Sequence, residues 1–216
     1  MSFKAVIFDL DGTLLDTLDD LADSANRVLA IHRLPEHPVN AYRYFVGDGL
    51  QTLVERILPE DKRTLETISQ VAFDFKEDYS QNWNVKSRMY EGIDLMLNGL
   101  QQAGLTLSIL SNKPHEFTSV CVQQMLSAWC FDPLLGARPD VPKKPDPAGA
   151  VEIAVRLQLD PAEIVYLGDT ATDMKTATGA GMYPVGALWG FRTAEELTIN
   201  GAAKLISRPQ QLLDLI

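Results

Sequence analysis

The feature that most constrains the fold is an alternation of short apolar runs with longer amphipathic stretches along much of the chain. The apolar runs are rich in β-branched residues, which is typical of buried strands, and the longer stretches repeat apolar residues at helical spacing. Strands that alternate with helices predict β-α-β units, and therefore an α/β fold with an open, Rossmann-like parallel sheet. The expected strands cover residues 4–8, 105–110, 134–136, 164–167, 183–188 and 203–207, and the expected helices between them cover residues 92–103, 145–157 and 172–180.

One part of the chain departs from this alternation. After the first expected strand, the apolar residues recur at helical spacing around residues 18–29, 50–58 and 65–82, and no strand-like run of any length interrupts them. We therefore expect two domains. Residues 1–14 and 86–216 would form the α/β core, and residues 15–85 a small all-helical domain inserted into it.

Polar residues gather where the expected strands end. In an open parallel sheet, ligands bind outside the carboxyl ends of the strands. Any one of these fragments could simply cap a helix, but several carboxylates packed together are costly without a cation, and oxygen ligands of this kind suit Mg²⁺. The fragments are Asp9–Thr13, Ser111–Lys113, Lys143–Pro147 and Gly168–Asp173.

These fragments carry a resemblance to the haloacid dehalogenase superfamily. The run Asp9-Leu10-Asp11-Gly12-Thr13 is similar to the DxDGT first motif of that family. Ser111 resembles its second motif, Lys144 before Pro145 its third, and Gly168-Asp169 with Asp173 its fourth. The four motifs occur in order, so the resemblance covers nearly the whole chain.

The resemblance implies a magnesium-dependent phosphatase that hydrolyses a small phosphate monoester through an aspartyl-phosphate. Asp9 would be the nucleophile, since an ionised carboxylate needs no base to attack phosphorus. Asp11 would protonate the leaving oxygen and then activate water. Mg²⁺ would be held by Asp9, the backbone carbonyl of Asp11, and Asp169, with Asp173 in support. Family members that cleave carbon–halogen or carbon–phosphorus bonds lack an aspartate corresponding to Asp11, which favours ester chemistry here.

The resemblance also implies a phosphate-binding set. Ser111 and Lys144 would bind the phosphoryl oxygens, together with backbone N–H groups near Leu10 and Asn112. Lys143 is an adjacent alternative to Lys144 that the sequence leaves open.

The helical insertion resembles the cap domain that these enzymes place over the site, where it sets specificity. Its stretch from Arg43 to Leu50 is similar to the corresponding part of phosphoglycolate-phosphatase-like members. This makes Arg43, Gly47, Asp48 and Gly49 candidates for substrate contact and phosphoglycolate a candidate substrate. From composition alone, a plain turn between helices explains the segment equally well.

Other functions stay open. Within the same fold, a sugar-phosphate mutase similar to β-phosphoglucomutase would return the phosphoryl group to the sugar, and a pyrophosphatase would cleave an anhydride. From another class, a non-catalytic or nucleotide-binding protein could keep the fold. The intact carboxylates and lysine, and the lack of a GxGxxG or GxxxxGK motif, argue against that last reading.

Charge and composition exclude several partners. The net charge of −10 argues against nucleic acid or an anionic membrane as a partner, because such binding needs many Lys and Arg side chains. We expect a cytoplasmic protein, a monomer or a homodimer, whose partner is a small phosphorylated metabolite. Cys121 and Cys130 are expected as buried or half-buried reduced thiols, and His115 at the start of a helix. Asp16, Asp19, Asp20 and Asp23 are expected on a solvated helix face.

Overall fold

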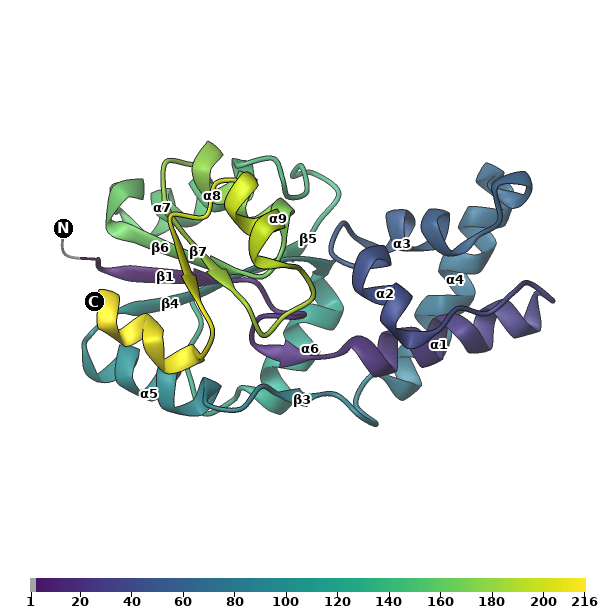
Figure 1. The fold of residues 1–216 in the computed structure, drawn as a ribbon, viewed down its shortest axis with the longest axis horizontal. Coiled ribbons are helices and arrows are strands. Elements are labelled where there is room, and N and C mark those ends of the chain that lie inside the picture. The colour runs from purple at the N-terminus through teal and green to yellow at the C-terminus, as the bar shows by residue number, and fades with distance from the viewer. Residues whose placement is uncertain (1–2) are drawn as a thin grey trace.

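The computed structural model describes residues 3–216 and contains one six-stranded parallel sheet (Figure 1). The strand order is β5-β4-β1-β6-β7-β8, with β1 in the interior between β4 and β6. All six expected strands are present, and the α/β parallel-sheet fold is confirmed. The strands are β1 (Ala5–Phe8), β4 (Thr106–Pro114), β5 (Leu134–Ala137), β6 (Ile164–Gly168), β7 (Tyr183–Ala187) and β8 (Lys204–Ile206).

Helices cover both faces of the sheet. Successive residues of a strand point to opposite faces, and in β1 they are apolar on both, so each face needs a covering layer. On one face Val6 and Phe8 belong to the larger hydrophobic cluster, which includes residues of α5 and α6. On the other, Ala5 and Ile7 pack with residues of α7 and α8. The elements of this part are α5 (Ile93–Gln102), α6 (His115–Met125), α7 (Ala148–Leu157), α8 (Ala171–Gly179), α9 (Ala194–Ile199) and the short 3₁₀ helices η2 (Pro161–Glu163) and η3 (Pro209–Leu215).

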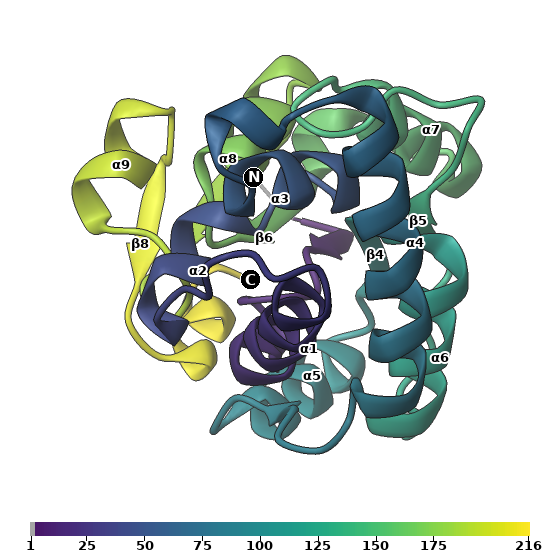
Figure 2. The ribbon, with the colours of Figure 1, turned by 90° about the vertical axis from the view of Figure 1, so that its right-hand side faces the viewer.

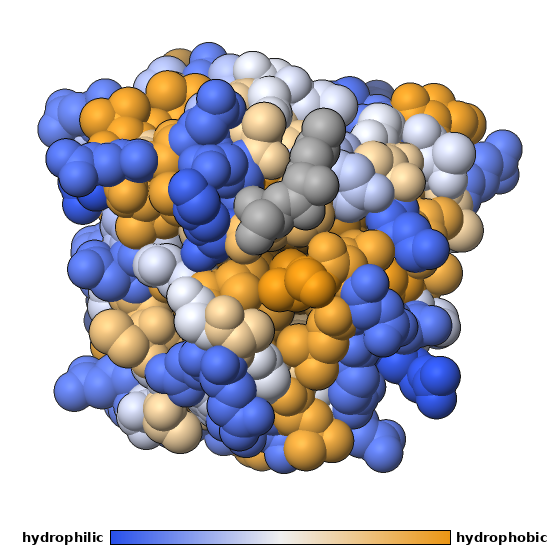
Figure 3. Space-filling model, turned by 90° about the vertical axis from the view of Figure 1, so that its left-hand side faces the viewer, coloured by the Kyte–Doolittle hydropathy of each residue, from blue (hydrophilic) through white to orange (hydrophobic). Residues whose placement is uncertain are grey.

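The remaining helices form a separate layer beyond the carboxyl ends of the strands, at the right of Figure 1 and in front in Figure 2. They are α1 (Leu18–Ile31), α2 (Val39–Phe45), α3 (Leu50–Ile57), the 3₁₀ helix η1 (Glu60–Lys62) and α4 (Leu65–Asn82). Two short antiparallel strands, β2 (Leu15–Asp16) and β3 (Arg88–Met89), connect this layer to the rest. Figure 3 shows the opposite face, with hydrophobic residues at its centre and hydrophilic ones around them.

Several details differ from the expectation. Strand β4 continues to Pro114, past its expected end at residue 110, and α7 begins at Ala148 because Pro145 and Pro147 precede it. Helix α2 was not expected. His115 begins α6 as expected, and its Nδ1 accepts a hydrogen bond from the Gly136 N–H at 3.1 Å. Both cysteines are free thiols, as expected. Cys121 is buried, but the expectation of burial is wrong for Cys130, which is exposed.

The prediction of a solvated acidic helix face is wrong for Asp16, which lies in β2 before α1 begins, and for Asp20. This side chain is 2 % exposed, and its carboxylate accepts hydrogen bonds from the backbone N–H groups of Lys86 and Ser87 and from the Ser87 hydroxyl, at 2.8–3.0 Å. Asp20 therefore ties the start of α1 to the segment that leads back into the sheet. Among residues 3–216, no helix has the length and apolar character needed to cross a membrane.

Candidate active site

Three buried carboxylates meet at the carboxyl ends of β1 and β6. Asp9 follows β1, Asp169 follows β6, and Asp173 lies in the first turn of α8. One oxygen of each lies within 4.8 Å of the others. Burial raises the pKa of Asp9 to about 8, with Lys144 opposing and Asp173 and Asp169 adding to the increase. Burial and the Asp173 charge raise the pKa of Asp169 to about 7. Burial and mutual repulsion thus disfavour the ionised forms of Asp9 and Asp169 in this cluster.

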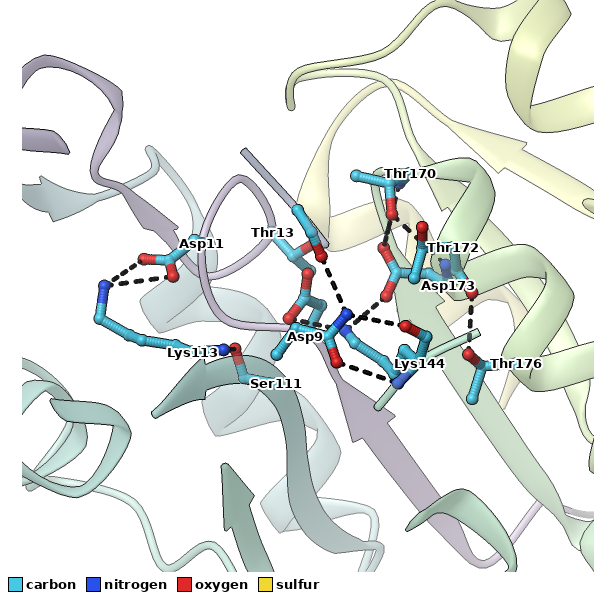
Figure 4. A network of polar contacts seen from close by, with 12 residues as sticks. Asp9, Asp11, Thr13, Ser111, Lys113, Lys144, Thr170, Thr172, Asp173 and Thr176 are labelled. Carbon is cyan, nitrogen blue, oxygen red and sulfur yellow. Dashed lines mark hydrogen bonds and ion pairs between the residues drawn. The ribbon is translucent and has the colours of Figure 1, made fainter. Parts of the chain in front are cut away.

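Lys144 is the cation of this cluster. Its ammonium lies 2.9 Å from Asp9 and 2.7 Å from Asp173, and its side chain is 2 % exposed (Figure 4). Burial alone would lower the pKa of Lys144, but the Asp173 and Asp9 charges raise it overall. Lys143 is exposed. Of the two lysines that the sequence left open, the structure brings Lys144 to Asp9.

Asp169 is held in place by its neighbours. One carboxylate oxygen accepts a hydrogen bond from the Thr13 hydroxyl at 2.9 Å, and the other from the Phe191 N–H at 2.8 Å. Gly12 has φ of +87°, and a methyl group at Gly12 or Gly190 would overlap the Asp169 side chain. The chain therefore leaves room for this carboxylate and fixes its orientation.

Asp173 is engaged by protein groups. One of its oxygens receives the Lys144 ammonium, and the other accepts from the N–H and hydroxyl of Thr170, at 3.1 and 2.6 Å. The bond from the Thr170 N–H is part of a capping box that begins α8. Asp173 is thus placed to orient Lys144 beside Asp9.

Asp11 points away from this cluster, as Figure 4 shows. Its carboxylate accepts from the Thr17 hydroxyl at 2.8 Å and from the Lys113 ammonium at 3.0 and 3.2 Å. Lys113 also donates to the Tyr79 hydroxyl at 2.8 Å. Thr17 and Tyr79 were not predicted from the sequence. Lys113 was expected among the polar residues at the strand ends, two positions after Ser111, but no role was predicted for it.

Of the predicted phosphate-binding residues, Leu10 follows β1, Ser111 and Asn112 lie near the end of β4, and Lys144 lies in the loop before α7. Ser111 is buried, and its hydroxyl accepts from the Lys113 N–H at 3.2 Å. The Asn112 side chain accepts from the Lys144 N–H at 2.9 Å and donates to the Lys144 and Gly47 carbonyls at 2.9 and 3.0 Å. The Asn112 amide therefore joins two motifs and the helical layer. The Leu10 side chain is buried, and its carbonyl accepts the N–H groups of Leu14 and Leu15 at 3.0 Å, which closes the turn after Asp9.

A cavity lies between the strand ends and the helical layer. Its volume is about 70 Å³. Asp9, Asp11 and Ser111 line it from the sheet side, and most of its remaining wall is apolar. The other lining residues are Leu21, Val46, Gly47, Gly49, Leu50, Leu53, Phe75, Lys76, Tyr79, Asn112, Lys113, Pro114 and Phe117.

Of the four candidates in the helical layer, Gly47 and Gly49 line this cavity. Arg43 instead donates to the Gly190 carbonyl at 2.9 Å, across the junction with the sheet domain. Asp48 accepts from the Thr172 hydroxyl at 2.7 Å and pairs with Arg56 at 2.5 Å. Arg43 and Asp48, both in the helical layer, thus each bind a residue of the sheet domain, and Asp48 also binds Arg56 within the helical layer.

Comparison with known proteins agrees with this site. The family model described as haloacid dehalogenase-like hydrolase matches residues 6–187. A phosphoglycolate phosphatase from Psychrobacter arcticus is 32% identical, covering 91% of this chain and 88% of that protein. An N-acetylmuramic acid 6-phosphate phosphatase from Pseudomonas aeruginosa is 29% identical, covering 100% of this chain and 96% of that protein.

Solved structures share the whole fold. The structure of a predicted phosphoglycolate phosphatase from Haemophilus somnus superposes with a TM-score of 0.92 at 26% identity, covering 100% of this chain and 98% of that one. The matched family model extends over all four motifs, from Asp9 to Asp173. The chain belongs to the haloacid dehalogenase-like hydrolase family and is a phosphatase of that fold.

Proposed function

We propose that this phosphatase requires Mg²⁺ and hydrolyses a small phosphate monoester through an aspartyl-phosphate formed on Asp9. The observation that carries the proposal is the position of Asp9. Its carboxylate lines the cavity and lies 2.9 Å from the buried Lys144 ammonium. One of its oxygens lies within 4.8 Å of an oxygen of Asp169, close enough for both to bind one metal ion.

The donor set fits a small divalent cation. Its three carboxylates are buried with one oxygen of each within 4.8 Å of the others, and burial raises the pKa of Asp9 and Asp169, so a cation between them would favour their ionised forms. Asp9, Asp169 and the backbone carbonyl of Asp11 would hold Mg²⁺, with Asp173 in support. When bound, the ion reduces repulsion between the anionic nucleophile and the anionic substrate.

Asp9 and Asp11 then have separate roles in the reaction. A carboxylate oxygen of Asp9 bonds to phosphorus while the ester P–O bond breaks, and Asp11 gives a proton to the departing oxygen. In the second half, water attacks the aspartyl-phosphate and Asp11 accepts a proton from it. Ser111, Lys144 and the N–H groups of Leu10 and Asn112 bind the phosphoryl oxygens.

The helical layer, residues 15–85, acts as a cap over the core of residues 1–14 and 86–216. Gly47 and Gly49 contact the leaving group, while Arg43 and Asp48 hold the cap against the core through Gly190 and Thr172. Phosphoglycolate is the first substrate to test, because curated relatives carry that name.

The reaction is tested by following phosphate release with EDTA and then with added Mg²⁺. EDTA should abolish release and Mg²⁺ should restore it. Asp9→Asn should abolish turnover with the fold intact, because an amide cannot replace the nucleophile. Full activity without metal, or in a folded Asp9→Asn protein free of deamidation, would contradict the proposal.

The substrate is tested by comparing kcat/KM for phosphoglycolate with kcat/KM for uncharged-alcohol esters of similar size. A preference of about tenfold corresponds to about 1.4 kcal/mol of transition-state binding and would support carboxylate recognition. Pyrophosphate and a hexose 1-phosphate belong in the same panel. Formation of a sugar-phosphate isomer, without inorganic phosphate, would identify a mutase instead.

A further inference from the structure

Lys113 is a buried cation that lines the cavity, and it lies on the side away from the carboxylates of Asp9 and Asp173 (Figure 4). It precedes Pro114, the last residue of β4, and its side chain is 5 % exposed. Its ammonium bonds to both oxygens of Asp11, at 3.0 and 3.2 Å. With the Thr17 hydroxyl at 2.8 Å, these contacts fix both the position and the plane of the Asp11 carboxylate.

The cap in turn positions Lys113. The Tyr79 hydroxyl of α4 accepts a hydrogen bond from the ammonium at 2.8 Å, and the ammonium lies 4.7 Å from the centre of the Tyr79 ring. Tyr79 stacks on Phe75 with ring centres 5.4 Å apart and meets Phe117 of α6 edge to face at 5.6 Å. These aromatic contacts hold the tyrosine at the junction of cap and core, so the cap completes the surroundings of Lys113.

We propose that Lys113 is a positioning residue for the acid–base step. It holds the Asp11 carboxylate and balances the negative charge that Asp11 acquires when it protonates the leaving oxygen, and Tyr79 makes this arrangement depend on the closed cap. The inference rests on the proposed role of Asp11 as the acid and base of the reaction.

The chemistry explains why a cation belongs at this place. As the P–O ester bond breaks, its electron pair stays on the departing oxygen, the Asp11 proton moves to that oxygen, and Asp11 is left as a carboxylate. A preorganised ammonium stabilises this developing charge more effectively in a buried site than in water. The same carboxylate then accepts the proton of the hydrolytic water and loses its charge, so in the second half Lys113 only orients the carboxylate.

The test separates esters that need a proton on the leaving group from esters that do not. The rate of phosphoenzyme formation is measured by rapid quench at saturating Mg²⁺ for an alkyl phosphate and for p-nitrophenyl phosphate, whose phenolate leaves unprotonated. Lys113→Met should slow the alkyl ester at least tenfold more than the aryl ester, with KM changed less than about threefold. Lys113→Arg should restore part of the alkyl rate, because it keeps the charge.

Two further variants keep the test decisive. Tyr79→Phe keeps the aromatic packing and removes only the hydroxyl, so it should give a smaller loss that is still selective for the alkyl ester. Lys62→Met, an exposed lysine of η1 outside the cavity lining, should leave both rates unchanged. If Lys113→Met does not fold, Tyr79→Phe decides, and an unchanged ratio of the two rates overturns the inference.

Other outcomes count against it as well. Equal losses on both esters in folded Lys113→Met would mean a purely structural role. A tenfold rise in KM at constant kcat would mean that Lys113 binds the substrate. In both cases wild-type phosphate release would still require Mg²⁺ and Asp9, so the inference would fail while the proposed function stood. Failure of the wild-type protein to release phosphate would instead remove the proposed function.

Discussion

At the scale of single residues, Lys144 is the cation that pairs with two buried carboxylates of the site, Asp9 and Asp173. Lys144→Met would leave Asp9 and Asp173 buried without their cation. We expect the free energy of unfolding to fall by about 3–5 kcal/mol. We also expect kcat to fall by a factor on the order of 100 or more, since a charged contact to the phosphoryl group is lost. Urea unfolding and phosphate release measure the two effects.

Lys143→Met is the matched control, because this neighbouring lysine is exposed. It should change the free energy of unfolding by less than about 0.5 kcal/mol. A larger effect of Lys143→Met than of Lys144→Met, on stability or on kcat, would reverse the assignment of the two lysines.

Much of the site was predictable at this scale because of where strands end. The carboxyl ends of neighbouring parallel strands lie at one edge, so Asp9 and Asp169 had to approach each other once their strands were recognised. The pairing of Asp11 with Lys113 was not predictable in the same way. The two residues are 102 positions apart, and the direction of each side chain depends on turn geometry that apolar periodicity does not record. Asp20 was misjudged for a related reason, since a carboxylate on an acidic helix face can also bind backbone N–H groups of another segment.

At the scale of elements, Asp20 shows how one side chain joins α1 to the segment before β3. Asp20→Ala would leave the Lys86 and Ser87 N–H groups without their acceptor. Hydrogen bonds to a charged group contribute about 1.5–3 kcal/mol, so we expect a loss of about 3 kcal/mol in the free energy of unfolding. Asp19→Ala, at the exposed neighbouring position, should cost less than about 0.5 kcal/mol. Denaturant midpoints decide the matter, and equal losses in the two variants would contradict the prediction.

Asp48, in the turn before α3, accepts a hydrogen bond from Thr172 of α8, and we expect this contact to stabilise the closed position of the cap. Burial would raise the pKa of Asp48, but the hydrogen bonds from Thr172 and Arg56 lower it overall, so its ionised form is favoured in the closed structure. Asp48→Ala should therefore open the cap. If closure loses about 1 kcal/mol, the population of the closed form relative to the open form falls about fivefold, and KM should rise by a similar factor.

Glu55→Ala, at an exposed position of α3, is the control for Asp48→Ala and should leave KM unchanged. Limited proteolysis provides a second measurement, with faster cleavage at the cap–core junction expected in Asp48→Ala alone. An unchanged KM together with unchanged proteolysis would show that Asp48 does not hold the cap.

At the scale of the whole molecule, the fold brings the carboxylates of Asp9, Asp169 and Asp173 together at the place that we propose for Mg²⁺. The raised pKa values of Asp9 and Asp169 mean that the metal-free folded state binds more protons than the unfolded chain between about pH 4 and pH 8. Stability of the metal-free protein should therefore fall as pH rises through this range. The three carboxylates lie at the end of β1, at the end of β6 and in α8, so repulsion between them destabilises the contacts among these three elements at the centre of the fold.

Mg²⁺ should relieve this repulsion and raise the melting temperature. A ligand present at about 100 times its Kd stabilises the folded state by about 2.7 kcal/mol. For a chain of this length, 1 kcal/mol corresponds to about 2–4 °C, so the expected rise is roughly 5–10 °C. The measurement is a thermal melt at pH 8 in EDTA and in saturating Mg²⁺, at equal ionic strength. Asp169→Asn should lose most of the rise, because it removes one ligand charge, and its metal-free form should melt no lower than the wild type, because it also removes repulsion. Asp140→Asn, an exposed position, should keep the full rise. An equal rise in Asp169→Asn and in the wild type would show that the ion stabilises the protein at another place.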